Sequence, residues 1–434
     1  MNPAEIGYIG FALMLVLILL GVNVAFCLIL VGFAGLVILI RLDPSLNSIA
    51  IIAFERATSY DFAVAPLFLL MSSFVSRSDI GKEAYEMART WVGQFKGGLA
   101  MATSVAAGLF AACCGSSLAS ALAMGTIAYP EMKRHNYDTK LSTGIIAAGG
   151  TLGILIPPSM GFILIGILTQ LSIGKLFIAG IIPGILEIVF YMVTIYILCK
   201  INPQFGPPTP ATTFRQKFGS LRLTWPVLLL FLLVIGGIYG GVFTPTEAGG
   251  IGAFGALVIS VIRKQLNGSG FVECLLDTAK MSAMMMALII GAFIFNQFLA
   301  VTRIPFVASE WVIGLGLNRY IILIIVIFLY IILGMIFDIY AILILTLPII
   351  FPTMMALGFN PVWYAVIMVR VIEVGLITPP FGINLFGLGG VVNVPMGTLY
   401  RSVIPFIISD ILHITLLIAL PSLSTFLPEM MLAR

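Results

Sequence analysis

The stretch Gly150-Thr-Leu-Gly-Ile-Leu-Ile-Pro-Pro-Ser159 lies in a long apolar run, and Glu373-Val-Gly-Leu-Ile-Thr-Pro-Pro-Phe-Gly382 is its counterpart in the second half of the chain. A Pro-Pro pair removes two backbone donors and clashes with the preceding helical turn. The residue before the pair is driven out of the helical region, and the nearby glycines make other backbone angles accessible. Each stretch therefore predicts a helix broken inside a membrane span, with free backbone carbonyls at the break.

The composition places these stretches in a membrane protein. The chain has 434 residues, of which 60% are hydrophobic and 9% charged, and its mean hydropathy is +1.15. A soluble domain carries about 25% charged residues. Spans in lipid must satisfy their backbone internally, and no barrel-like alternation is present, so helices are expected. The net charge of +4, without a basic stripe, gives no indication of nucleic-acid binding.

We predict ten helical spans of about 20 apolar residues each. They lie near 5–21, 22–40, 60–77, 143–170, 176–199, 223–240, 247–262, 281–300, 363–390 and 403–420. Two further apolar regions are too long for one helix and have a small or charged residue in the middle, so we interpret them as re-entrant helical hairpins. These are 98–130 and 320–352. Amphipathic stretches at Lys82–Gln94 and Pro305–Leu315 are expected to lie in the interface.

The two halves of the chain repeat one another. Pro157-Pro158 and Pro379-Pro380 are 222 positions apart, and so are Pro130 and Pro352, and Gly153 and Gly375. A constant offset across such landmarks indicates duplication. We predict a first repeat at 1–205, a cytoplasmic linker at 206–222 and a second repeat at 223–434. Five spans per repeat is an odd number, so the second repeat is expected to be inverted.

The distribution of Lys and Arg predicts the orientation. With the linker in the cytoplasm, fifteen Lys and Arg residues fall on the inside, among them Arg77, Arg263 and Lys280. Six fall on the outside, among them Arg434, and Arg370 is left within a span. This agrees with the positive-inside rule and places both termini in the periplasm. The first residues lack the positive region and cleavage site of a signal peptide, so the first apolar run is expected to remain in the mature protein.

The broken helices and hairpin tips are the candidate binding elements. Free carbonyls at membrane depth need a partner, and a sodium ion is a hard, oxygen-seeking one. The half-helix after each break presents a positive N-terminus that suits an anion. The alternatives are a plain proline kink at each break and close helix packing at the small residues of each tip. Asp338, at the second tip, is expected either to bind a cation or to cap the following helix.

Other polar groups in the spans have simpler interpretations. Arg370 and Glu373 are three residues apart on one helix face, and Asp410 and His413 have the same spacing, so pairing within each helix is favoured. The five cysteines have no metal-ligand spacing, and the two histidines make a histidine-based metal site improbable. No metal or organic cofactor is therefore expected other than sodium as a coupling ion.

At the hairpins and broken helices, the sequence resembles the DctM-like large membrane subunit of tripartite ATP-independent periplasmic (TRAP) transporters. The resemblance covers the whole chain and is carried by Gly153-Ile-Leu-Ile-Pro-Pro-Ser159, Thr244-Pro-Thr-Glu-Ala248, Glu373-Val-Gly-Leu-Ile-Thr-Pro-Pro380 and Gly382-Ile-Asn-Leu-Phe386. It implies an elevator-type transporter of the ion transporter superfamily in the bacterial inner membrane. Such a protein imports an organic anion with sodium, without an ATPase, and works with a small four-helix membrane subunit and a soluble periplasmic substrate-binding protein.

The resemblance also implies site residues, most of them acting through backbone carbonyls. The first sodium site would be formed by Gly115, Ser116, Gly153, Ile156 and Pro158, and the second by Gly334, Gly375, Thr378 and Phe381. Substrate would lie between them, near Ser117, Ser159 and Asn384. Arg370 departs from the small or amide residue expected at its position, and we include it as a candidate contact to a substrate carboxylate.

Two other functions compete with this interpretation. A stand-alone divalent-anion/sodium symporter of related build would need no binding protein, but the Ser-Asn-Thr tip frequent in such proteins is absent from both hairpins. A membrane scaffold or intramembrane enzyme is the other alternative. The sequence has neither a His-Glu-x-x-His nor a Gly-x-Ser-x-Gly motif, so no catalytic residues are predicted.

Overall fold

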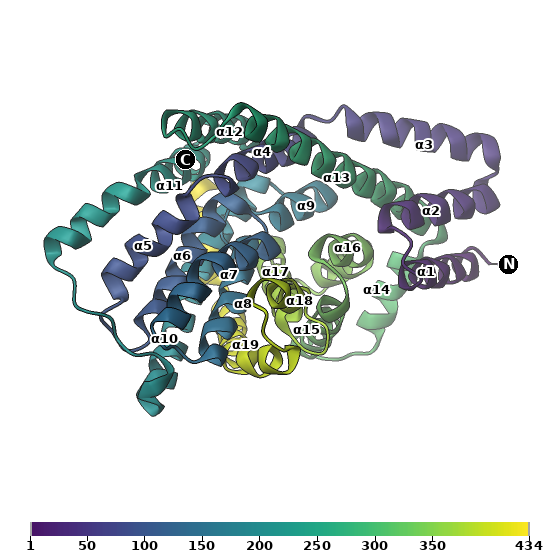
Figure 1. Cartoon of the computed structure of the whole chain (residues 1–434). Coiled ribbons are helices and arrows are strands. Elements are labelled where there is room, and N and C mark those ends of the chain that lie inside the picture. Colours follow the sequence, from purple (N-terminus) through teal and green to yellow (C-terminus); the bar gives the residue numbers. More distant parts are fainter. Residues whose placement is uncertain (1, 433–434) are drawn as a thin grey trace.

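The structure is a computed structural model that describes residues 2–432, and every regular element among them is a helix (Figure 1). The first half contains α1 (Pro3–Leu19), α2 (Val24–Ile40), α3 (Leu42–Ala57), α4 (Val64–Ser76), α5 (Ile80–Val92), α6 (Gly98–Cys114), α7 (Ser117–Arg134), α8 (Thr139–Leu155), α9 (Met160–Thr169) and α10 (Ile173–Ile201). The second half contains α11 (Phe214–Tyr239), α12 (Pro245–Ile262), α13 (Gly268–Thr302), α14 (Ile304–Gly314), α15 (Arg319–Ile336), α16 (Ile339–Ala356), α17 (Pro361–Ile377), α18 (Ile383–Val392), α19 (Met396–Ala419) and α20 (Ser422–Leu432). Arg434, which the charge count placed outside, lies beyond the described residues.

The helices are long and apolar enough for a polytopic membrane protein. Among the described residues, seven stretches could cross a membrane, or up to nine if each strongly bent helix pair is one span. Three of the ten expected spans are not counted, because α1, α2 and α17 have only 17 residues each, whereas α15 and α16, expected as the arms of a hairpin, are counted. The long helix α13 has 35 residues, about 52 Å at 1.5 Å per residue, which exceeds a hydrocarbon core of about 30 Å.

Both predicted helix breaks are present. α8 ends at Leu155, before Pro157-Pro158, and α9 begins at Met160 with Ser159 as its N-cap. In the second half α17 ends at Ile377, before Pro379-Pro380, and α18 begins at Ile383. The chain therefore leaves the helical conformation where the proline pairs remove donors, as the sequence predicts.

The two predicted hairpins are also present and extend slightly further than expected. α6 and α7 pack against each other around a turn at Gly115 and Ser116, where Gly115 has a φ of 64° that favours glycine. α15 and α16 are joined at Phe337 and Asp338. The helix lengths of α6 to α9 and of α15 to α18 match almost residue for residue in the same order, which agrees with the constant sequence offset.

Three segments differ from the expectation. Helix α3 was not predicted, because Asp43, Glu55 and Arg56 interrupt its apolar character. The C-terminal α20 was not predicted either, since its apolar run is short and contains Pro428. The expected linker 206–222 is non-helical only to residue 213, because a capping box of Thr213 and Gln216 starts α11 at Phe214.

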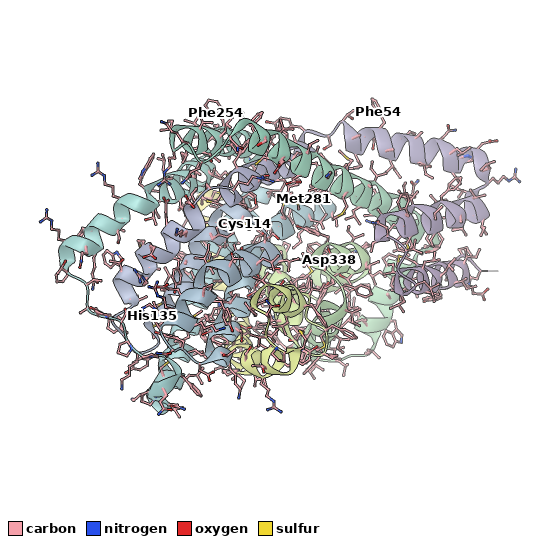
Figure 2. All side chains as sticks on the ribbon, viewed as in Figure 1. Phe54, Cys114, His135, Phe254, Met281 and Asp338 are labelled. Carbon is pink, nitrogen blue, oxygen red and sulfur yellow. The ribbon has the colours of Figure 1, made fainter. Side chains whose placement is uncertain are left out.

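The hairpins and broken helices form an inner body together with α10 and α19, and the outer frame consists of α1 to α5 and α11 to α13 (Figure 1). Within the inner body α8 packs against α6, α7, α17 and α19, and the frame is built on contacts of α2 with α13 and of α4 with α12. Figure 2 shows Phe54 and Phe254 on the outer rim, where they are 71% and 68% exposed. Large exposed apolar side chains of this kind suit a lipid environment.

Ion pairs join the frame helices at one end. Arg77, after α4, contacts Glu273 at 2.5 Å and Asp277 at 3.3 Å, both at the start of α13. Arg263, after α12, holds Glu83 of α5 through both guanidinium nitrogens, at 2.7 and 2.5 Å. Both arginines belong to the positive residues expected on the cytoplasmic side, and each binds acids of another frame helix.

Candidate functional site

A small cavity lies where the two hairpin tips meet the two broken helices. Its volume is about 170 Å³, and it is lined by residues from α7, α8, α9, α16, α17 and α18 together with both tips. The lining residues are Gly115, Ser116, Ser117, Leu118, Ile154, Gly161, Asp338, Ile339, Tyr340, Leu376, Ile383 and Asn384. The sequence predicted that tips and breaks share one site, and this cavity brings both tips together with both broken helices.

The residues of the first predicted sodium site converge on the junction of hairpin tip and break. A Cβ at Gly153 would lie 2.5 Å from the Ser116 carbonyl oxygen, and one at Gly115 would lie 3.0 Å from the Pro158 carbonyl oxygen. Only glycine at these positions lets the two backbones approach so closely. The Ile156 side chain instead packs towards α10, against Gly184, so any role of this residue rests on its backbone.

The second predicted sodium site repeats this close approach. A Cβ at Gly375 would lie 2.6 Å from the Gly334 Cα, so the second hairpin touches its broken helix backbone to backbone. The Gly382 amide donates to the Met335 carbonyl at 3.3 Å and ties the break to the tip. The Thr378 hydroxyl donates to the Val374 carbonyl at 2.6 Å within α17. The Phe381 side chain is 53% exposed, which leaves its backbone as the relevant group.

Two of the four predicted substrate residues line the cavity. Asn384 is buried and accepts a hydrogen bond from the Ser117 hydroxyl at 3.3 Å, while its Nδ2 amide has no partner among the described residues. Ser159 is fully buried and caps α9 by accepting from the Phe162 amide at 3.3 Å. Asp338 lines the cavity and caps α16 by accepting from the Ala341 amide at 3.4 Å, so the capping alternative is present.

Arg370, the fourth predicted substrate residue, lies away from the small cavity. Its side chain is fully buried and contacts the carboxylates of Glu187, Glu373 and Asp410, and it does not line the cavity. The predicted pairing of Arg370 with Glu373 is confirmed, at 3.2 Å. The predicted pairing of Asp410 with His413 is replaced by separate contacts of both to Arg370. The expected contact of Arg370 with a substrate carboxylate therefore has no counterpart in this arrangement.

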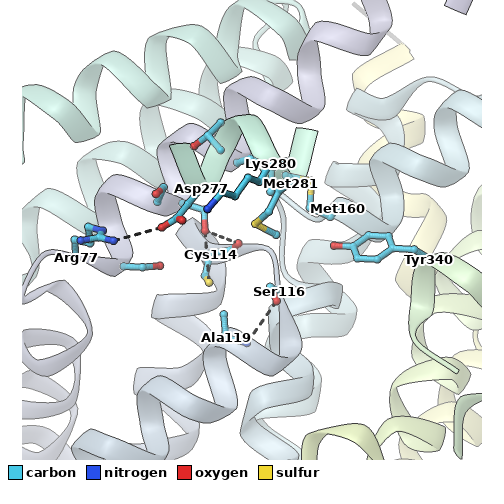
Figure 3. Close-up of a pocket in the computed structure, with 14 residues that line it drawn as sticks. Arg77, Cys114, Ser116, Ala119, Met160, Asp277, Lys280, Met281 and Tyr340 are labelled. Carbon is cyan, nitrogen blue, oxygen red and sulfur yellow. Dashed lines mark hydrogen bonds and ion pairs between the residues drawn. The ribbon is translucent and has the colours of Figure 1, made fainter. Parts of the chain in front are cut away.

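A larger cavity adjoins the small one. Its volume is about 490 Å³, and it lies between frame helices α4 and α13 and the first hairpin tip (Figure 3). Figure 3 shows Arg77, Asp277 and Lys280 on the frame side and Ser116 and Tyr340 on the side of the hairpin tips. Ser116 and Tyr340 line both cavities. Sequence reasoning missed this space, because it depends on the packing of α13 against residues more than 150 positions away.

The described residues contain no group of three or more His, Cys, Asp and Glu side chains arranged to hold a metal ion. The five cysteines are buried and free, which agrees with their interpretation as packing residues. The oxygen donors at the two junctions are therefore backbone carbonyls and hydroxyls. Such donors suit a hard monovalent cation better than a transition metal.

Comparisons with known proteins identify the family. Residues 11–423 match the family described as tripartite ATP-independent periplasmic transporter, DctM component. The chain is 36% identical to the C4-dicarboxylate TRAP transporter large permease protein DctM of Pseudomonas aeruginosa, over 92% of this chain and 93% of that protein. It is 32% identical to the isethionate TRAP transporter permease protein DctMQ of Oleidesulfovibrio alaskensis, over 98% of this chain and 65% of that protein.

The fold itself also has a solved counterpart. The structure of the Alcanivorax borkumensis YdaH transporter matches with a TM-score of 0.60 at 16% identity, over 89% of each chain. At this identity the likeness concerns the fold alone. The family match and the relatives, by contrast, cover most of the chain and include its hairpins and broken helices. The chain therefore belongs to the DctM family of large membrane permease subunits of TRAP transporters, which are transporters and not enzymes.

Proposed function

We propose that the chain imports a small organic anion, a carboxylate or a related acid, by coupling its movement to sodium ions. Its family establishes a permease of organic anions. The proposal of sodium coupling rests on two junctions, where Gly153 contacts Ser116 and Gly375 contacts Gly334. At each junction a helix interrupted at membrane depth meets a hairpin tip, and carbonyl oxygens of this kind bind a sodium ion well.

The small cavity supports an anionic substrate. Its volume of about 170 Å³ is below the roughly 300 Å³ of a site for a drug-sized molecule, which favours a compact ligand. Asn384 offers an unpartnered amide donor, and the N-termini of α9 and α18 begin beside the cavity. Amide donors and helix N-termini both stabilise negative charge. Substrate would then lie between Ser117 and Asn384, next to both sodium junctions.

The larger cavity is the proposed exit path. It is lined by Arg77 and Lys280, which belong to the positive residues expected on the cytoplasmic side. Its side next to the hairpin tips shares Ser116 and Tyr340 with the small cavity. Alternating access would be completed by sliding the inner body against the frame, as in an elevator mechanism. Both termini would face the periplasm, and the two halves would be inverted repeats.

The partners follow from the family. A small membrane subunit is implied by the fused relative DctMQ, of which the chain covers 65%. We propose that this subunit extends the frame and that a soluble periplasmic binding protein delivers the substrate. The C4-dicarboxylates named for the Pseudomonas relative are the first compounds to test, with isethionate, named for the fused relative, as the second.

Sodium coupling predicts a specific response of uptake. The chain is reconstituted into liposomes with its small subunit and binding protein, and radiolabelled succinate or isethionate is supplied outside. An inward sodium gradient is expected to raise initial uptake at least about tenfold over an equal potassium gradient, since each coupled ion adds its own driving force. Equal uptake in the two gradients would reject sodium coupling. Full uptake without the binding protein would favour the stand-alone symporter.

Replacing Asn384 by leucine is expected to weaken substrate binding. A hydrogen bond to a charged group contributes about 1.5–3 kcal/mol, so the half-saturating substrate concentration should rise by about 10- to 150-fold. The measurement is initial uptake against substrate concentration at saturating sodium. Asn47→Leu is the matched control, because Asn47 is an exposed residue of frame helix α3. Unchanged half-saturation in Asn384→Leu would move the substrate away from this cavity.

A further inference from the structure

A charged cluster around Arg370 is buried in the inner body, and the proposed transport path does not use it. We call it the Arg370 cluster, and its members are Glu187 on α10, Arg370 and Glu373 on α17, and Asp410 and His413 on α19. All five side chains are fully buried. The cluster joins three helices that are far apart in the sequence, and it lies outside both cavities.

The guanidinium group of Arg370 contacts every other member of the cluster. Its Nη1 lies 3.2 Å from Glu187 Oε1 and 3.2 Å from Glu373 Oε2, and its Nη2 donates to Asp410 Oδ1 at 2.5 Å. Its Nε donates to His413 Nδ1 at 3.1 Å. A ring nitrogen that accepts from a guanidinium carries no proton, so His413 is neutral with its hydrogen on Nε2. Arg370 is thus the single positive charge of the cluster.

The remaining polar neighbours add no charge. Tyr191 on α10 donates its hydroxyl to Glu187 Oε1 at 2.7 Å, and Thr151 on α8 lies 3.2 Å from the same oxygen. The Phe190 ring lies against His413, with ring centroids 5.3 Å apart. If all three carboxyl groups were ionised, the cluster would carry two uncompensated negative charges. Each uncompensated buried charge costs several kcal/mol by general estimates.

One oxygen of each carboxyl group is left without a partner. Among the described residues, no hydrogen bond is made by Glu187 Oε2, Glu373 Oε1 or Asp410 Oδ2, although all three are buried. An ionised carboxylate would need these oxygens satisfied, whereas a protonated one converts an oxygen into a neutral hydroxyl. The described side chains include no group of three or more His, Cys, Asp and Glu arranged to hold a metal ion. A proton is the smallest cation that could compensate these carboxyl groups.

We propose that the Arg370 cluster is a proton-binding site, which holds at least one proton on Glu187 and Asp410 in the folded protein at neutral pH. The bound proton reduces the excess negative charge while the guanidinium continues to hold α10, α17 and α19 together. This site is separate from the proposed sodium junctions. The inner body would therefore bind protons at one place and sodium ions at another. It depends on the balance of three acids against one arginine and does not require the proposed sodium coupling.

Infrared spectroscopy of the purified protein tests the proposal directly. A protonated carboxyl group in an apolar interior has a C=O stretching band that carboxylates lack and that shifts in D₂O. The wild-type protein at pH 7.5 is expected to show this band. The Glu187→Gln/Asp410→Asn double variant should lose it, because Arg370 and Glu373 then balance each other. Asp338→Asn, which removes the acid of the second hairpin tip, is the matched control and should keep the cluster's band.

Thermal unfolding in detergent gives an independent readout. A proton held only by the folded state makes folding less favourable as pH rises, by up to tenfold in the folding equilibrium constant per pH unit and per proton. The wild-type midpoint should therefore fall from pH 5.5 to 8.5 relative to that of the double variant. If the double variant does not fold, the single variants Glu187→Gln and Asp410→Asn serve the same comparison, each with a smaller slope than wild type.

Three results would overturn the proposal. One is a wild-type spectrum without a protonated carboxyl band. Another is a band that survives in every cluster variant and disappears in Asp338→Asn. The third is stabilisation of the wild type by sodium at pH 8.5 that is lost in Asp410→Asn, because this would make the cluster a metal-cation site. The proposed sodium-driven uptake is measured separately, so either idea can fail without the other.

Discussion

Replacing Gly375 by alanine is expected to abolish sodium-driven uptake while the protein still inserts into the membrane. The new methyl group would lie 2.6 Å from the Gly334 Cα, where carbon atoms in contact need about 3.5–4.0 Å. Both neighbours are backbone, so no side-chain rotation relieves the clash, and α15 and α17 must separate by about 1 Å. A displacement of this size moves the carbonyl oxygens of the proposed second sodium site out of coordination distance.

The measurement for Gly375→Ala is initial uptake in proteoliposomes under a sodium gradient, with thermal unfolding in parallel. Overpacking of this kind costs about 1–3 kcal/mol, which a folded membrane protein tolerates, whereas uptake should fall more than about 100-fold. Gly236→Ala is the matched control, since Gly236 lies in frame helix α11 and a Cβ there meets no atom within 4 Å. Normal uptake by Gly375→Ala would show that this junction is not a coupling site.

Replacing Arg370 by leucine is expected to destabilise the inner body severely. The change removes the only positive charge of the Arg370 cluster and leaves three acids at 0–1% exposure without their common partner. Breaking a buried ion pair on one side costs about 3–5 kcal/mol, and here one substitution breaks three such contacts. The effect is expected to be a loss of folded protein, seen as poor yield and a large fall in the thermal midpoint.

Size-exclusion profiles and thermal unfolding in detergent measure the effect of Arg370→Leu. Arg215→Leu is the matched control, because Arg215 is exposed near the start of α11. An Arg370→Leu/Glu187→Gln/Glu373→Gln/Asp410→Asn variant should recover part of the stability, since it removes the orphaned acids. A wild-type thermal midpoint for Arg370→Leu alone would mean that the cluster contributes little to the fold.

The breaks and hairpin tips were predictable because their causes are local. Pro157-Pro158 and Pro379-Pro380 end a helix wherever they stand, and Gly115 permits the left-handed turn with a φ of 64°. Each of these features also occurs twice in the sequence, at a constant offset, so that each copy supported the interpretation of the other. Helix α3 could not be found in this way, because its counterpart in the second half is part of the continuous α13 and offers no repeated landmark.

Among the charged residues, contacts within one helix could be predicted from the sequence, and contacts between distant helices could not. The i,i+3 spacing predicted the pairing of Arg370 with Glu373, because helix geometry fixes which side chains share a face. Glu187 also contacts Arg370, yet it lies 183 positions earlier, and only the packing of α10 on α17 brings the two together. The sequence therefore left Arg370, paired only with Glu373, as a candidate contact to a substrate, while the folded chain surrounds that arginine with acids.

The two residues that line both cavities, Ser116 and Tyr340, have a consequence for the speed of release. Both residues therefore lie between the proposed substrate cavity and the larger cavity. Side-chain rotations occur in picoseconds to nanoseconds, whereas sliding of whole helical bodies takes microseconds to milliseconds. In the proposed elevator cycle, rotation of these two side chains is therefore too fast to be the slow step, and sliding of the inner body would set the turnover rate.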